Sequence, residues 1–108
     1  MAATRTILEP AELTRRLSAL PSWSVEGATL TRRWEFGDFD EAMRFVNAVA
    51  DVARELDHHP DLYNVYNRVR LSVTTHDAGG LTAMDIAFAT RVDALTDGAL
   101  TASGAESS

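Results

Sequence analysis

The sequence predicts an α+β fold in which a single-layer antiparallel β-sheet of about four strands has helices packed on one face. Its 108 residues suffice for one hydrophobic core but not for two, so we expect a single domain over residues 1–108. Apolar residues follow helical and strand periods in the order helix, two strands, helix, one or two strands, helix. Strands and helices do not alternate as parallel βαβ units, which favours an antiparallel sheet.

The N-terminal part predicts a helix followed by a β-hairpin. Residues 9–20 carry leucines at helical spacing and start near Pro10, whose missing N–H would have no partner in a first helical turn. Pro21 ends this helix. Alternating residues on both sides of a turn at Glu26-Gly27 then predict two paired strands, and they are Trp23, Val25, Leu30, Arg32 and Trp34.

The second helix is expected over residues 39–56. Asp38 is a good N-cap residue, and Glu41 stands three residues later in a variant of the capping box. Apolar residues then recur with a 3.6-residue period. Pro60 ends the helix because its ring excludes α geometry at the preceding residue, so His58 and His59 lie at or just past the last turn.

The C-terminal half predicts strand and then helix. Residues 62–76 alternate apolar with polar side chains, either as one long strand or as a hairpin with a turn at Asn67-Arg68. After a glycine-containing loop, Thr82 and Asp85 form a second capping box that opens a third helix, expected to run to about Asp97. The small, polar residues 101–108 are expected to be a frayed tail.

Composition narrows the classes of function. The net charge of −6 and the scattered arginines, with no lysine at all, argue against a nucleic-acid partner. With no cysteine, disulfides, thiolate nucleophiles and Cys-rich zinc sites are excluded. No signal peptide is recognised, and no apolar run approaches the roughly 20 residues that a membrane-spanning helix needs. We therefore expect a cytoplasmic protein without a membrane partner.

All three histidines fall within residues 58–76, across a predicted helix end and a predicted strand end. Such ends meet at one rim of an α+β layer, where sites commonly form. Histidine can give and take a proton near neutral pH, so the cluster indicates an acid/base site. A helix C-terminus favours imidazolium, which would help His58 or His59 act as an acid. Asp57 could orient one imidazole.

Two other interpretations of the histidines stay open. The histidines could be ordinary surface or core residues, or they could hold a metal, although adjacent histidines rarely point at one ion and no HExxH motif is present. Asp85 can serve as a capping acid alone or reach the rim as a supporting residue. Tyr66 is near His76 by strand count, whereas the other aromatics (Tyr63, Trp23 and Trp34) are expected in the core or an interface.

The same stretch resembles the signature region of the pterin-4a-carbinolamine dehydratase family. The matching elements are His58-His59-Pro60, the aromatic Tyr66, His76, and Asp85 in the following helix. The resemblance implies the family's fold and a hydro-lyase reaction, in which 4a-hydroxytetrahydropterin loses water to give quinonoid dihydropterin for tetrahydrobiopterin recycling. It implies no metal and no cofactor. It also implies a homodimer or homotetramer, and an aromatic amino acid hydroxylase as a partner in the same pathway.

The resemblance also implies which residues form the active site. It implies His58 and His76 as the groups that transfer protons and His59 as a group that binds and polarises the pterin. The segments that would contact the substrate are Asp57, His58, His59, Thr74, Thr75, His76 and Asp77. Two positions depart from the family's pattern: Arg54 stands where an acidic or similar polar residue is usual, and Leu62 where a Trp is frequent. An alternative function is a non-catalytic dimerisation partner of a transcription factor, through residues 39–56.

Overall fold

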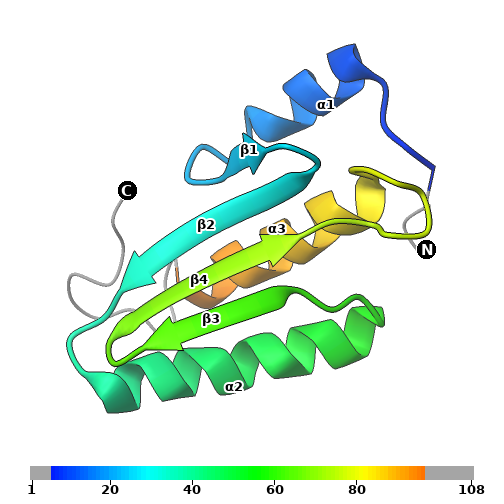
Figure 1. Ribbon diagram of the computed structural model, residues 1–108. Coiled ribbons are helices and arrows are strands. Elements are labelled where there is room, and N and C mark those ends of the chain that lie inside the picture. Colours follow the sequence, from blue (N-terminus) through cyan, green and yellow to red (C-terminus); the bar gives the residue numbers. More distant parts are fainter. Residues whose placement is uncertain (1–5, 97–108) are drawn as a thin grey trace.

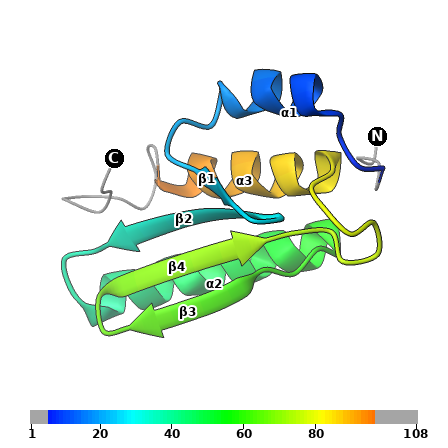
Figure 2. The same cartoon turned by 45° about the horizontal axis from the view of Figure 1, so that its top comes forward.

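Four antiparallel strands form one sheet, and the helices lie on one side of it (Figures 1 and 2). The strand order is β1-β2-β4-β3. This computed structural model describes residues 6–96, so the predicted tail over residues 101–108 and the predicted helix end at Asp97 lie outside the described residues. The elements are α1 (Pro10–Leu17), β1 (Ser24–Glu26), β2 (Thr29–Glu35), α2 (Phe39–Leu56), β3 (Asp61–Val65), β4 (Arg68–Val73) and α3 (Ala83–Thr96).

The pairing of β2 with β4 explains which side chains are buried. Leu30 faces Val73 and Trp34 faces Val69, and all four side chains are nearly inaccessible to water. Because side chains alternate along a strand, the residues between them point to the other face. The side chains of that second face include Arg33, Glu35, Arg68 and Arg70, and they are exposed. The predicted α+β class with helices on one face is therefore confirmed.

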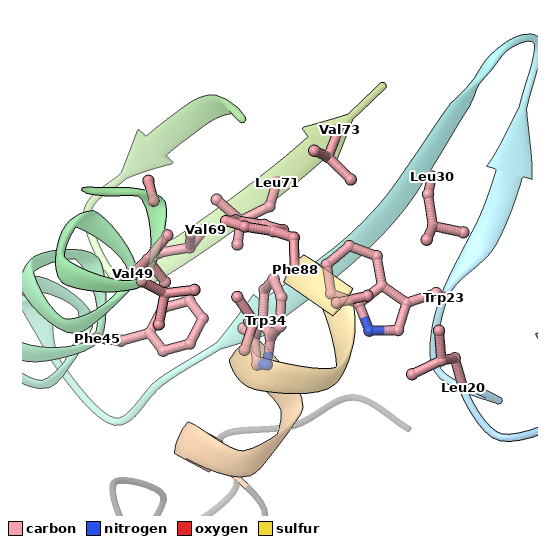
Figure 3. Packing of buried hydrophobic residues seen from close by; sticks show 14 of the residues in the cluster. Leu20, Trp23, Leu30, Trp34, Phe45, Val49, Val69, Leu71, Val73 and Phe88 are labelled. Carbon is pink, nitrogen blue, oxygen red and sulfur yellow. The ribbon is translucent and has the colours of Figure 1, made fainter. Parts of the chain in front are cut away.

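The hydrophobic core lies between the sheet and its helices (Figure 3). Aromatic rings form its centre: Phe45 of α2 lies 4.7 Å from Trp34 and 5.1 Å from Phe36, between ring centroids. Trp23 meets Trp34 edge to face at 5.8 Å. Phe88 of α3 is fully buried beside Val69 and Leu71 in the same cluster. The core thus joins α2, which precedes His58 and His59, to β4, which precedes His76.

The predicted boundaries hold closely for α2 and less well for α1. The side chain of Asp38 accepts a hydrogen bond from the Glu41 N–H at 2.8 Å, so the expected cap is present. Helix α1 ends at Leu17, three residues before the predicted end. The N–H of Leu20 bonds to the carbonyl of Leu17, an i to i+3 bond of the kind that tightens a last helical turn, and this accounts for the difference.

Residues 61–73 form a hairpin, which settles the alternative that the sequence left open. The turn comprises Tyr66 and Asn67, one residue earlier than the predicted turn. Asn64 holds it by donating its amide to the carbonyls of Tyr66 and Arg68, at 3.2 and 2.9 Å. Tyr66 is 62% exposed and Tyr63 is 56% exposed, so neither tyrosine belongs to the core. Within residues 6–96, no helix has both the length and the apolar character to cross a bilayer.

Candidate active site

The C-terminal end of α2 positions two of the histidines. Asp57 follows the helix in the left-handed conformation, with φ 51° and ψ 46°, a region that Asp tolerates better than most residues with a side chain. The N–H of His58 donates to the carbonyl of Ala53 at 3.1 Å, as in a Schellman turn. The chain therefore leaves the helix sharply. His58 enters the interior with 4% of its surface exposed, whereas His59 remains exposed.

The end of β4 carries the third histidine in a tight loop. The N–H of Thr75 donates to the carbonyl of Gly80 at 3.2 Å, and the N–H of Gly79 donates to the carbonyl of Thr75 at 3.0 Å. Gly79 has φ 80°, which a residue without a Cβ reaches with little strain. These bonds close the loop and hold His76 and Asp77 at its exposed tip.

The two chain segments face each other across a cavity of about 170 Å³. This volume lies below the roughly 300–1,000 Å³ of sites for drug-sized ligands, so it suits a small, compact ligand. All three histidines take part in its wall. Of the residues predicted to contact substrate, Thr75 alone is missing from the lining, because its side chain is buried beneath the loop. The lining residues are Asp57, His58, His59, Thr74, His76 and Asp77.

Beneath the cavity, Asp85 of α3 is fully buried and bound by three donors. Its Oδ1 lies 2.7 Å from Nε2 of His58. Its Oδ2 accepts hydrogen bonds from the Thr75 hydroxyl and from the Thr82 N–H, each at 2.8 Å. The Thr82 hydroxyl lies 2.8 Å from the Thr75 hydroxyl and accepts from the N–H of Met84, completing the predicted helix cap. Asp85 therefore both caps α3 and orients His58.

Thr75, which the resemblance places among the substrate-contacting residues, has a structural role that the sequence does not reveal. Its hydroxyl connects β4 to the cap of α3 and to the carboxylate that holds His58. Phe88, which lies edge to face with the His58 ring at 6.5 Å between centroids, was not singled out at all. The helical spacing from Asp85 to Phe88 is the signal that could have placed both on the same side of α3.

Three residues singled out from the sequence lie away from this site. Tyr66 precedes β4 and His76 follows it, so the six residues of that strand separate them by roughly 20 Å at the usual rise per residue. Tyr66 therefore does not support the histidines. Arg54 is exposed and pairs with Asp51 at 2.9 Å. Leu62 lies on β3, is 41% exposed and is not part of the cavity wall.

The geometry defines a class of protein: one with a carboxylate-anchored imidazole and two further imidazoles around a small cavity, suited to acid/base chemistry. Because Nε2 of His58 is engaged by Asp85, Nδ1 is the nitrogen left for a ligand. A carboxylate on one ring nitrogen fixes the tautomer and orientation of a histidine, as in the hydrolase triads. Among residues 6–96, no group of three or more His, Cys, Asp or Glu side chains has an arrangement that could hold a metal ion.

Comparison with known sequences identifies the family. The family model described as pterin 4 alpha carbinolamine dehydratase matches residues 6–95, and the chain belongs to this family. A relative from Acidobacterium capsulatum is 49% identical over 88 residues, which cover 82% of this chain and 96% of the relative. A Synechococcus relative is 44% identical over 90 residues, covering 83% and 97%. Both carry the name pterin-4-alpha-carbinolamine dehydratase as a provisional assignment.

Solved structures show the same fold. A crystal structure described as a transcriptional coactivator/pterin dehydratase from Brucella melitensis superimposes with a TM-score of 0.77 and 39% sequence identity, covering 82% of this chain and 96% of that one. A pterin dehydratase-like protein described as a RuBisCO assembly factor in the alpha-carboxysome gives a TM-score of 0.56 and 27% identity, covering 68% and 84%. The fold therefore occurs in proteins that are described by catalytic and by non-catalytic roles.

Proposed function

We propose that this protein is a hydro-lyase that dehydrates 4a-hydroxytetrahydropterin to quinonoid dihydropterin. The observation that carries the proposal is the meeting of His58, His59 and His76 at one cavity, with His58 anchored to the buried Asp85. Membership of the dehydratase family supports the substrate class. The small volume of the cavity suits one compact heterocycle whose remainder extends into solvent.

The reaction requires one base and one acid. The bond between C4a and the hydroxyl oxygen breaks, the oxygen leaves as water after gaining a proton, N5 loses its proton, and a C4a=N5 double bond forms. In our proposal His58 accepts the N5 proton, because the Asp85 carboxylate stabilises the imidazolium that results. His76, on the opposite wall, protonates the leaving hydroxyl. His59 binds and polarises the pterin.

The direct test is to generate the 4a-carbinolamine and follow its dehydration in stopped flow with and without the protein. We expect acceleration by the wild-type protein and a loss of about tenfold or more in the His76→Ala variant, since a positioned acid or base contributes at least this much. An Arg44→Ala variant on the exposed side of α2 serves as a control and should keep full activity. Absence of acceleration, or full activity without His76, would contradict the proposal.

Asp57 is expected to bind substrate, but its left-handed backbone conformation lowers the stability of the fold. In the Asp57→Gly variant we expect the free energy of unfolding to rise by about 0.5–1 kcal/mol, because glycine adopts the left-handed conformation without strain. We also expect KM to rise because a carboxylate is removed from the cavity wall. Urea denaturation and steady-state kinetics measure the two effects. Asp57→Asn, which tolerates the same backbone, should raise KM without stabilising the fold, and an unchanged KM in both variants would remove Asp57 from the binding site.

We place this activity in the recycling of tetrahydrobiopterin in the cytoplasm, beside an aromatic amino acid hydroxylase that produces the carbinolamine. We also propose that the protein is a homodimer or homotetramer in solution. Strand β3 is a sheet edge, and it carries the exposed apolar residue Leu62. Such an edge is open to pairing with a second copy of the chain.

A lysine at this edge should weaken assembly. We expect Leu62→Lys to shift the protein toward monomer in light scattering coupled to size exclusion, because a charge on an edge strand opposes edge-to-edge pairing. Val25→Lys is the matched control: Val25 is 42% exposed on β1, the strand at the opposite edge of the sheet. The same mass for the wild type and both variants would exclude β3 as the site of pairing.

A second candidate function is that of a non-catalytic regulatory partner. Structural relatives described as a transcriptional coactivator and as an assembly factor favour it. The exposed side of α2, over residues 39–56, is the surface that we propose for this role. The dehydration assay separates the two functions, because a regulatory partner alone would not accelerate loss of water and would not depend on His76.

A further inference from the structure

The face of the sheet opposite the helices carries a second and larger cavity. It has a volume of about 440 Å³, compared with about 170 Å³ at the histidines, and none of the described residues lines both cavities. Its wall comes from β2, β3 and β4. The polar and exposed residues of this wall include Arg33, Glu35, Tyr63, Val65, Arg68 and Arg70.

Two of these arginines oppose each other directly. Arg33 of β2 and Arg70 of β4 are register partners with side chains on the same face of the sheet. Like charges at directly opposed positions of an antiparallel pair are destabilising. The two guanidinium groups engage partners on opposite sides: Arg33 bonds to Glu26 of β1 at 3.3 Å, and Arg70 lies 4.8 Å from the ring centroid of Tyr63 on β3. Arg33 is thus paired with a carboxylate, whereas Arg70 contacts an aromatic ring.

Neighbouring residues add charge and apolar surface. Arg68 lies two residues from Arg70 on the same face and is the register partner of Glu35. Tyr63 and Val65 are 56% and 38% exposed. Tyrosine and arginine are enriched in protein interfaces, where a guanidinium can bind a carboxylate through two parallel hydrogen bonds. This combination is characteristic of a contact surface.

The charge of this face contrasts with that of the whole chain. The net charge of the chain is −6, whereas the wall of this cavity has three arginines and one carboxylate, that of Glu35. Three arginines with the Glu26 and Glu35 carboxylates beside them offer few cationic contacts for an extended nucleic acid, whose affinity rises with the number of phosphates neutralised. A short acidic segment of a protein would meet only the local field. It could also pack apolar side chains against Tyr63 and Val65.

We propose that this open sheet face is a docking surface for an acidic segment of a partner protein. Carboxylates of the segment bind at the Arg33, Arg68 and Arg70 seam and relieve the repulsion between the opposed cations. The apolar side chains of the segment contact Tyr63 and Val65. This surface is separate from the histidine cavity, so its occupation does not depend on the proposed dehydratase activity.

Fluorescence anisotropy tests the proposal with a labelled peptide of alternating Glu and Leu residues. The matched probes are the same peptide with Gln in place of Glu, and a labelled single-stranded DNA. We expect saturable binding of the acidic peptide that weakens with added salt. The Arg68→Gln/Arg70→Gln double variant should bind it about tenfold more weakly, from the loss of two exposed charge contacts. It should retain the wild-type circular dichroism spectrum and dehydration rate.

The Arg44→Gln/Arg54→Gln double variant is the control, because it removes the same charge from exposed positions of α2. It should bind the acidic peptide as the wild-type protein does. Equal weakening in the two double variants would show a net-charge effect and overturn the proposal. The proposal would also be overturned if the wild-type protein showed no saturable binding of the acidic peptide. The same holds if it bound the Gln peptide equally well, or the DNA more tightly than the acidic peptide.

Discussion

Replacing His58 by Ala is expected to lower kcat for carbinolamine dehydration by about 10²- to 10⁴-fold, the usual contribution of a positioned general acid or base. The protein holds His58 by a buried hydrogen bond, at 2.7 Å to Asp85. Its ring also lies edge to face with the buried Phe88. Bulk water cannot substitute for an imidazole that is 4% exposed, whereas it can partly substitute for the exposed His76.

The Asp85→Asn variant tests whether His58 and Asp85 act as a unit. An amide offers one acceptor oxygen where the carboxylate offers two, so donors that faced the other oxygen lose their partner. In Asp85→Asn we expect kcat to fall nearly as far as in His58→Ala, with a smaller change in KM. The His58→Ala/Asp85→Asn double variant should lose little more activity than either single variant, because the effects of residues that act as a unit are not additive. Stopped-flow kinetics at several pH values measures this.

Asp93→Asn provides the control for Asp85, because Asp93 lies on the same helix but contacts Arg32 and Trp23 rather than the cavity. It should lower stability and leave kcat unchanged. If Asp85→Asn retains the wild-type kcat and pH profile, Asp85 serves only as the cap of α3. If the double variant is far slower than either single variant, the two residues act independently.

Replacing Arg32 by Met is expected to lower the free energy of unfolding by about 3–5 kcal/mol, the usual effect of removing one partner of a buried ion pair. Arg32 has 3% of its side chain exposed, and its Nη1 donates to Oδ1 of Asp93 at 2.6 Å. The guanidinium carbon also lies 4.7 Å from the ring centroid of Trp34. The substitution removes the guanidinium that neutralises the Asp93 carboxylate, which is 15% exposed and therefore poorly hydrated. Urea denaturation gives the magnitude.

The Arg32→Met/Asp93→Leu double variant should recover most of the lost stability, because replacing both charges by apolar groups of similar size is often neutral. An Arg54→Met variant controls for simple loss of an arginine, since its pair with Asp51 is 71% exposed on both sides and should contribute little. Both variants should keep the dehydratase rate. A double variant as unstable as Arg32→Met would mean that packing of Arg32, rather than its charge, stabilises the fold.

Local patterns predicted the elements of this protein well. The 3.6-residue period and the Asp38 cap placed α2 at the residues where it occurs, because a helix is decided by neighbours within a few positions. The alternation of Leu30, Arg32 and Trp34 correctly placed them on one face, although only the structure shows Arg32 buried among apolar residues. The position of the hairpin turn was missed by one residue. It depends on the side-chain contacts of Asn64.

By itself, the sequence determined that helices and strands occur in a given order and that the histidines stand at a helix end and near a strand end. The tertiary structure decided that these ends face one cavity, that Asp85 anchors His58, and that Tyr66 lies at the far end of β4. Residues 58 and 85 come together because α2 and α3 pack on the same face of the sheet. Periodicity is a local property of the chain, but the distance between side chains on different elements depends on how those elements pack.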